Sequence, residues 1–126
     1  MTEKKMSFIF VAIGGAVGAS MRYAISLIPV KSDFPILTLI TNIIGAIAIG
    51  FITGIMSEKE NLSPNMTLFW KTGVCGGFTT FSTFSLEALN LIENRSYALG
   101  GLYIGLSVLF CIVGVYCGKR LFLMVH

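Results

Sequence analysis

The chain is poor in charge and in the residues that build catalytic and metal sites. Only 12% of its 126 residues are charged, and its single histidine is the terminal His126. There is no Ser-His-Asp or Cys-His set, no pair of neighbouring acids suited to acid–base work, and no phosphate-binding loop. These absences argue against hydrolases and metal-dependent enzymes, and they predict that the chain is not an enzyme.

The cysteine positions argue against a cysteine-based metal site, and the small net charge argues against a nucleic-acid-binding protein. Cys75, Cys111 and Cys117 all fall in apolar segments and have no histidine at metal-ligand spacing, so we expect them to be reduced and buried in the membrane. The formal charge is +3, and the charges lie mostly between apolar runs. A nucleic-acid-binding protein needs a clustered basic face, so no nucleic-acid partner is expected.

Apolar residues dominate what is there. They make up 55% of the chain, and the mean hydropathy is +0.84. A soluble domain of this size could not bury so much apolar surface, whereas a lipid bilayer can accept it. We therefore predict one membrane domain over residues 1–126.

Four apolar runs can be separated, at about residues 6–28, 36–56, 68–92 and 97–118. Each is long enough to cross a hydrocarbon layer about 30 Å thick as a helix. Backbone polar groups inside a bilayer must be paired within the segment, which favours helices. The predicted fold is an all-α, multi-pass membrane protein with four transmembrane helices.

Glycine pairs spaced by four recur in all four runs, which indicates close helix packing. They are Gly14/Gly18, Gly50/Gly54, Gly73/Gly77, Gly101/Gly105 and Gly114/Gly118. The sequence leaves open which pairs pack within one subunit and which pack between subunits.

The most distinctive segment runs from Gly76 to Ser85, where two glycines precede a dense group of hydroxyl side chains. Polar groups are costly in hydrocarbon, so this group is expected to line a path or a binding site. The glycines allow two interpretations. A break in the helix would free carbonyl groups that can bind a monovalent cation, whereas an unbroken helix would use Gly76 and Gly77 at a helix crossing.

Other polar and aromatic residues repeat at helical spacing and predict a pore wall. Alone, Asn42 could simply join two helices. The stripes are Thr38 with Asn42; Phe78, Phe81 and Phe84, if the helix is continuous there; Thr80, Thr83 and Glu87; and Tyr103, Ser107 and Cys111. Ring edges and neutral donors suit an anion, while ring faces suit a cation, so the residues alone leave the sign of the solute open.

Three motifs resemble the Fluc family of bacterial fluoride channels, also called CrcB. They are Gly14-Gly15-x-x-Gly18-x-x-x-Arg22-Tyr23, Asn42 followed by Gly45, and the run from Gly76 to Glu87. The resemblance covers the whole chain. It implies an antiparallel, dual-topology homodimer in the bacterial plasma membrane, with the third helix broken near its middle. It also implies two pores per dimer that export fluoride passively and selectively.

The resemblance also implies roles for individual residues. A sodium ion at the dimer interface would be held by the main-chain carbonyls of Gly76 and Thr79. Asn42 would donate to fluoride, and the ring edges of Phe81 and Phe84 would flank its path. The remaining implied positions are Thr38, Thr80, Thr83, Tyr103 and Ser107 in a polar track, Glu87 near one pore end, and Arg22 in a vestibule or a structural role. Cys111 departs from the pattern, because some relatives have a serine hydroxyl there and a thiol is a weaker donor.

Two observations bear on the competing interpretations. Six basic residues fall on the side that would hold both termini and three on the other, a larger bias than insertion in both orientations would ideally have. The alternative function is a small multidrug-type exporter driven by protons. Such an exporter needs a buried carboxylate, usually in its first helix, where this chain has Arg22 and no acid. A third alternative is a non-transporting assembly subunit.

Overall fold

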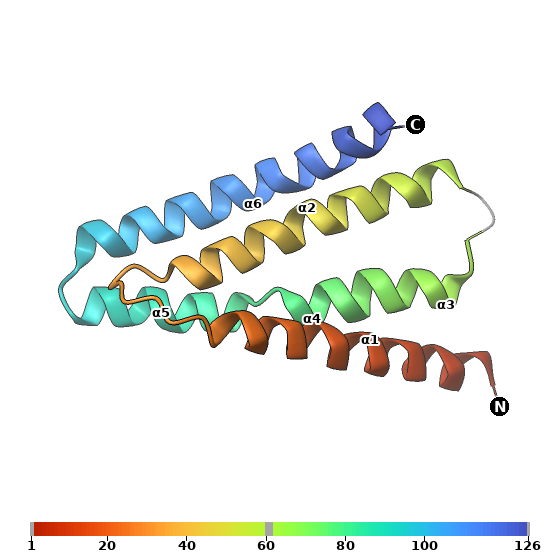
Figure 1. The fold of residues 1–126 in the computed structure, drawn as a ribbon, viewed down its shortest axis with the longest axis horizontal. Helices are drawn as coiled ribbons and strands as arrows, with labels where there is room; N and C mark the ends of the chain where they lie inside the picture. The colour runs from red at the N-terminus through yellow and green to blue at the C-terminus, as the bar shows by residue number, and fades with distance from the viewer. Residues whose placement is uncertain (1, 60–61, 126) are drawn as a thin grey trace.

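The computed structural model describes residues 2–59 and 62–125, and over these residues the chain forms helices joined by short connections (Figure 1). The elements are α1 (Glu3–Ser26), α2 (Ile36–Glu58), α3 (Pro64–Thr67), the π-helix η1 (Leu68–Cys75), α4 (Gly76–Phe78), α5 (Phe81–Glu93) and α6 (Tyr97–Val125). α2 packs along α6, and α1 packs along η1 and α4. Both ends of the chain lie at the same end of the bundle (Figure 1).

Local chemistry moves several helix ends from the positions expected from hydropathy. α1 begins at Glu3 because the Thr2 hydroxyl caps it, accepting a hydrogen bond from the Lys5 N–H at 3.4 Å. It ends at Ser26 rather than at 28, because the residue before Pro29 is disfavoured in a helix. α6 continues to Val125, beyond the expected 118, because basic residues are good helix formers even where they end an apolar run.

Three helices, α1, α2 and α6, are long and apolar enough to cross a membrane. The third apolar run, expected over 68–92, begins earlier, at Pro64, and is divided among α3, η1, α4 and α5. Pro64 occupies the first turn of α3, where its missing N–H costs no helical hydrogen bond.

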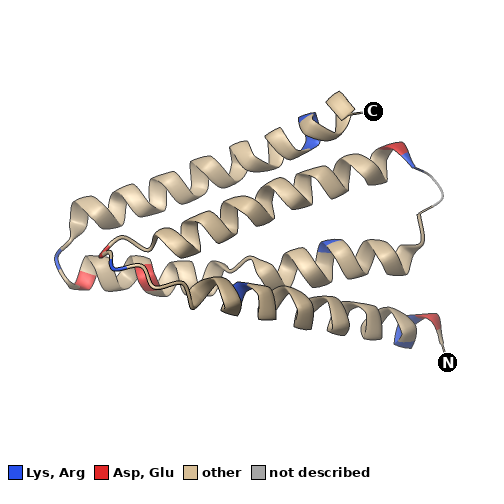
Figure 2. Cartoon of the chain, viewed as in Figure 1, with Lys and Arg blue, Asp and Glu red and all other residues tan. Residues whose placement is uncertain are grey.

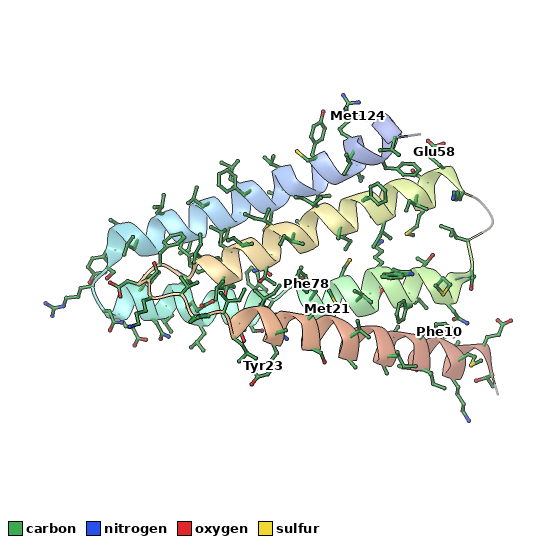
Figure 3. All side chains as sticks on the ribbon, viewed as in Figure 1. Phe10, Met21, Tyr23, Glu58, Phe78 and Met124 are labelled. Atoms are coloured by element: carbon green, nitrogen blue, oxygen red, sulfur yellow. The ribbon has the colours of Figure 1, made fainter. Side chains whose placement is uncertain are left out.

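The exterior is apolar between two charged ends. Figure 2 shows charged positions concentrated near the two ends of the bundle, with few along the helices between them. Figure 3 shows side chains pointing outward along the helices, including Tyr23 on α1 and Met124 on α6, both of which are exposed. Such a surface suits lipid contact.

Glycine forms the seam between α1 and the third segment. A Cβ atom added at Gly14 would overlap the carbonyl oxygen of Phe69, and one added at Gly18 would overlap that of Val74. The two backbones therefore approach each other as closely as only glycine permits. The first and third glycine pairs of the sequence thus pack against each other within one chain.

A second glycine seam joins α2 to α6. A Cβ atom at Gly50 would overlap the Val115 carbonyl oxygen, and one at Gly118 would overlap the Ile47 carbonyl oxygen. Gly101 and Gly105 differ, because an added Cβ there would meet nothing within 4 Å. Within the described part of the chain, this pair takes no part in helix packing.

The seam between α2 and α6 can be tested with matched alanines. Gly118→Ala is expected to lower the free energy of unfolding by about 1–3 kcal/mol, because its methyl group meets rigid backbone. Gly105→Ala is expected to leave the subunit as stable or to stabilise it by up to about 1 kcal/mol, through helix propensity. Thermal unfolding in detergent, followed by circular dichroism, measures both. Equal effects of the two substitutions would contradict the assigned seam.

Candidate functional site

The site is built around an interruption between α4 and α5. Thr79 has φ −87° and ψ 156°, and Thr80 has φ −149° and ψ 122°, so both residues are extended. Gly76 and Gly77 come just before them, and glycine weakens a helix through its backbone entropy. The interruption leaves backbone groups without their usual partners in an apolar segment.

The amide of Asn42, on α2, contacts both backbone groups of Thr80. Its Oδ1 accepts from the Thr80 N–H at 2.8 Å, and its Nδ2 donates to the Thr80 carbonyl at 3.1 Å. The amide thus replaces the helical partner that the Thr80 N–H has lost, and it gives a second donor to the Thr80 carbonyl, which as the N-cap carbonyl also accepts the first helical hydrogen bond of α5. An amide carries two N–H groups, so Asn42 keeps one for a further acceptor.

Hydroxyl groups satisfy the ends of the two flanking helices. The Thr80 side chain caps α5 by accepting from the Thr83 N–H at 3.1 Å. The Thr79 N–H and hydroxyl both donate to the Cys75 carbonyl, at 3.0 and 2.9 Å. The N–H groups that a continuous helix would direct at the Gly76 and Thr79 carbonyls are those of Thr80 and Thr83. Both are used elsewhere, so these two carbonyl oxygens lack their helical donors.

Arg22 ties α1 to the same region. Its Nε donates to the Gly77 carbonyl at 3.1 Å, and the residue is half-buried. The guanidinium thereby takes up one of the last carbonyl groups of α4, where the helix dipole favours a cation. Arg22 thus contacts the backbone immediately before the interruption.

A cavity of about 390 Å³ opens beside the interruption. Five of the nine residues predicted for the path lie on its wall: Asn42, Thr80, Phe81, Phe84 and Ser107. Gly76 and Thr79, predicted as sodium ligands, and Cys111 lie on the same wall. They come from α2, α4, the interruption, α5 and α6. The structure therefore gathers on one wall residues that are far apart in the sequence.

Ser107 is the unsatisfied polar group of this wall. The residue is 7% exposed, and in the described part of the chain its hydroxyl has no hydrogen-bond partner. An unpaired buried hydroxyl costs free energy of desolvation. Because it borders the cavity, it can donate to a ligand there.

Aromatic rings run from the cavity wall into the bundle. The centroids of Phe81 and Phe84 are 5.4 Å apart, and those of Phe84 and Tyr103 are 5.1 Å apart. Tyr103 is completely buried. Phe78 does not continue this row, contrary to the stripe expected for an unbroken helix. It lies at the end of α4 near the centre of the bundle, where its ring packs beside Gly45 (Figure 3).

The other residues predicted for the path, Tyr103, Thr38, Thr83 and Glu87, lie outside the wall of the large cavity. The Tyr103 hydroxyl donates to Glu87 Oε1 at 3.2 Å. Glu87 and Thr38 line a second, smaller cavity of about 120 Å³. The side chain of Thr83 is half-buried and lines neither cavity.

The sequence analysis missed several residues of the cavity wall, including Cys75 and Gly45. Cys75 is buried and lines the large cavity, although its position in an apolar run suggested only packing. Gly45 lets the interruption approach α2, because a Cβ there would overlap the Thr79 methyl group. Its spacing of three residues from Asn42, on the same helix, is the signal that could have marked it. Within residues 2–59 and 62–125, no group of three or more His, Cys, Asp or Glu side chains is placed to hold a metal ion.

The Asn42 contact predicts a large stability effect. Asn42→Ala leaves the Thr80 N–H unpaired and removes one donor from the Thr80 carbonyl, so the free energy of unfolding is expected to fall by about 1–3 kcal/mol. Ile44→Ala, at an exposed position on the same helix, serves as the control and is expected to cost less than about 1 kcal/mol. Thermal unfolding in detergent compares them. A loss for Asn42→Ala no larger than that for the control would refute this role of the amide.

Comparisons with known proteins agree with the motifs. Residues 9–119 match the family model described as CrcB-like protein, Camphor Resistance (CrcB). The fluoride-specific ion channel FluC of Ruminiclostridium cellulolyticum is 43% identical over 122 residues, which cover 94% of each chain. FluC of Clostridium perfringens is 42% identical over 127 residues, covering 95% of this chain and 99% of the relative. FluC of Clostridium novyi is 44% identical over 124 residues, covering 93% of this chain and 97% of the relative.

These relatives are named as ion channels, which agrees with the prediction that the chain is not an enzyme. The ion-channel names of these relatives and the three long apolar helices together indicate that the chain is a multi-pass membrane protein. The resemblance expected from the Gly76–Glu87 motif is confirmed over most of the chain, which belongs to the CrcB-like family.

Proposed function

We propose that this chain forms a passive fluoride channel of the bacterial plasma membrane. The observation that carries the proposal is the wall of the large cavity, which combines neutral hydrogen-bond donors with aromatic rings. The names of the relatives, fluoride-specific ion channels at above 40% identity, support the same solute.

The donors on this wall can replace the water around a small anion. Asn42 has one amide N–H left over, and the Ser107 hydroxyl has no partner within the described residues. No Lys, Arg, Asp or Glu belongs to the described wall of the cavity. Neutral donors bind an anion without the strong hold of a full positive charge, so the ion can leave again quickly.

The rings of Phe81 and Phe84 support selectivity for fluoride. Phenyl rings have electropositive edges, which attract an anion, and bulky walls narrow the path. Fluoride is the smallest halide, so a narrow path of donors and ring edges accommodates it better than chloride. Cys111 belongs to the same wall, where its thiol is a weak donor beside the stronger Ser107.

A second copy of the chain would complete the site. Phe81 lines the cavity and yet is 78% exposed in the single chain, so a closed path around its ring needs another surface. We propose that an antiparallel copy, inserted with dual topology, supplies it and that the homodimer holds two pores. Lipid covers the rest of the apolar exterior.

The backbone at the interruption fits a bound sodium ion. The carbonyl oxygens of Gly76 and Thr79 lack their helical donors, because the N–H groups of Thr80 and Thr83 bond to Asn42 and to the Thr80 hydroxyl. Free carbonyls in a membrane segment are suitable ligands for a monovalent cation. The ion would neutralise these dipoles at the dimer interface, while Asn42 and Thr80 hold the backbone in place.

The direction of transport follows from electrostatics. In an acidic medium part of the fluoride is protonated, and neutral hydrogen fluoride enters the cell and dissociates in the less acidic interior, which traps the anion. A membrane potential that is negative inside drives an anion outward at about 2.3 kcal/mol per charge per 100 mV, so a passive pore suffices for export.

Fluoride efflux from liposomes tests the proposal. Purified protein in vesicles loaded with potassium fluoride should release fluoride within seconds after valinomycin is added, as measured by a fluoride electrode, with no pH gradient. Vesicles that retain fluoride as protein-free vesicles do would overturn the proposal. Efflux that requires a pH gradient would favour the proton-driven exporter instead.

The ring residues generate a specific prediction. Phe81→Ile and Phe84→Ile are each expected to lower fluoride flux by about 100-fold or more, because a branched aliphatic side chain offers no electropositive edge. Phe8→Ile, an exposed position on α1 outside the cavity, is the control and should retain normal flux. Size-exclusion chromatography verifies that each variant still assembles. Normal flux in both path variants would exclude the ring-edge mechanism.

Sodium removal tests the central ion separately. Replacing sodium by N-methyl-D-glucamine during purification is expected to weaken dimer assembly by about 10-fold or more, because the Gly76 and Thr79 carbonyl oxygens would lose the cation that offsets their partial negative charge. Dimer fractions measured across a dilution series in the two salts give the comparison. Identical dilution curves would remove sodium from the mechanism and leave the pore unaffected.

A further inference from the structure

The smaller cavity lies under the connection between α1 and α2, away from the large cavity wall. Its volume is about 120 Å³, and its lining combines Ser32 and Phe34 of this connection with Thr38 of α2 and Glu87 of α5. Hydroxyl, carboxylate and aromatic groups thus meet in one small space. Ser32 and Phe34 are not among the residues predicted for the path from the sequence, and neither lines the large cavity.

The row of aromatic rings continues to this cavity. Phe34 packs against Tyr103 edge to face, with centroids 5.5 Å apart and ring planes at 81°. Tyr103 in turn contacts Phe84, whose ring lines the large cavity. The four rings from Phe81 to Phe34 therefore form a continuous series of contacts, with one end on each cavity.

The family resemblance already implies a path by way of Tyr103, Thr38 and Glu87, and we propose that Phe34 joins these residues as the fourth ring of the path wall. This inference rests on the proposed fluoride channel and extends the path to the connection between α1 and α2. Phe34 is then a residue of the path, although it lies outside every apolar run.

The chemistry of the smaller cavity suits passage rather than storage of an anion. The Ser32 Oγ accepts from the Phe34 N–H at 3.1 Å, so its own proton can donate to a passing ion. The Glu87 carboxyl group accepts from the Tyr103 hydroxyl and holds that ring at the edge of the cavity. The donor that an anion meets here is the Ser32 hydroxyl beside the Phe34 ring, and a single neutral donor holds an anion weakly enough for it to pass.

A second edge-to-face pair provides a matched control. Phe51 of α2 packs on Phe122 of α6, with centroids 5.7 Å apart and ring planes at 83°, and Phe51 belongs to neither cavity lining. Replacing Phe51 by leucine removes a contact of the same kind as replacing Phe34. Both substitutions remove an edge-to-face contact, but only Phe34 lines a cavity of the proposed path.

The experiment compares fluoride flux in assembled dimers of the wild type, Phe34→Leu, Phe34→Tyr and Phe51→Leu. Phe34→Leu is expected to lower flux by about 10-fold or more, because it removes the ring edge, and Phe34→Tyr to stay within about 3-fold of the wild type. Phe51→Leu is expected to keep wild-type flux per dimer.

The outcomes separate this inference from the function on which it rests. Normal flux in Phe34→Leu, or an equal fall in Phe51→Leu, overturns the inference and leaves the channel intact. Absence of flux in the wild type overturns the channel itself. If Phe34→Leu does not assemble, Phe34→Met replaces it under the same expectation. Failure of both to assemble would assign Phe34 to folding and overturn its place in the path.

Discussion

The structure depends on the pairing of one side-chain amide with one backbone residue. In an apolar segment every backbone N–H and carbonyl needs a partner, and the Thr80 N–H has lost its helical partner at the interruption. Asn42 supplies a new partner and also donates to the Thr80 carbonyl, so one amide contacts both backbone groups. Without this contact the extended residues would be costly to keep out of water, and α4 and α5 would gain by joining into one helix.

Two glycine seams hold the parts that meet at this point. α1 is fixed against η1 and α4, and α2 is fixed against α6, in each case with backbone against backbone. The large cavity draws its walls from both pairs, through α4 on one side and through α2 and α6 on the other. Its shape therefore depends on the contacts that join the pairs, chiefly the Asn42 amide and the packing of Thr79 on Gly45.

The sequence predicted the elements better than the contacts between them. Hydropathy and helical spacing identify the apolar helices, because a helix is a local structure with a regular period. The cluster of Ser and Thr side chains after Gly77 indicates the site, because polar groups are costly in hydrocarbon. The hydrogen-bond partners at the site cannot be predicted in this way, because they are far apart in the sequence. Asn42 on α2 pairs with Thr80, and helical spacing says nothing about the distance between residues of different helices.

Two residues illustrate the limit. Phe78 shares a spacing of three with Phe81 and Phe84, and the extended backbone between α4 and α5 turns it to another side. Phe34 lies in a connection, where periodicity carries no information, and it reaches Tyr103 only through the way the chain turns after Pro29. Helix ends shifted for the same reason, since capping and proline act through single residues rather than through average hydropathy.

The pair of hydrogen bonds between Asn42 and Thr80 also fixes how the Asn42 amide is oriented. A reversed amide would set its NH₂ group against the Thr80 N–H and its oxygen against the Thr80 carbonyl, so only one orientation is tolerated. The direction of the remaining N–H is therefore dictated by main-chain geometry rather than by rotamer choice. In the proposed channel, a substitution that slides α5 along α2 would change the direction of this donor and so its contact with an ion, even though the substituted residue itself lies away from the cavity.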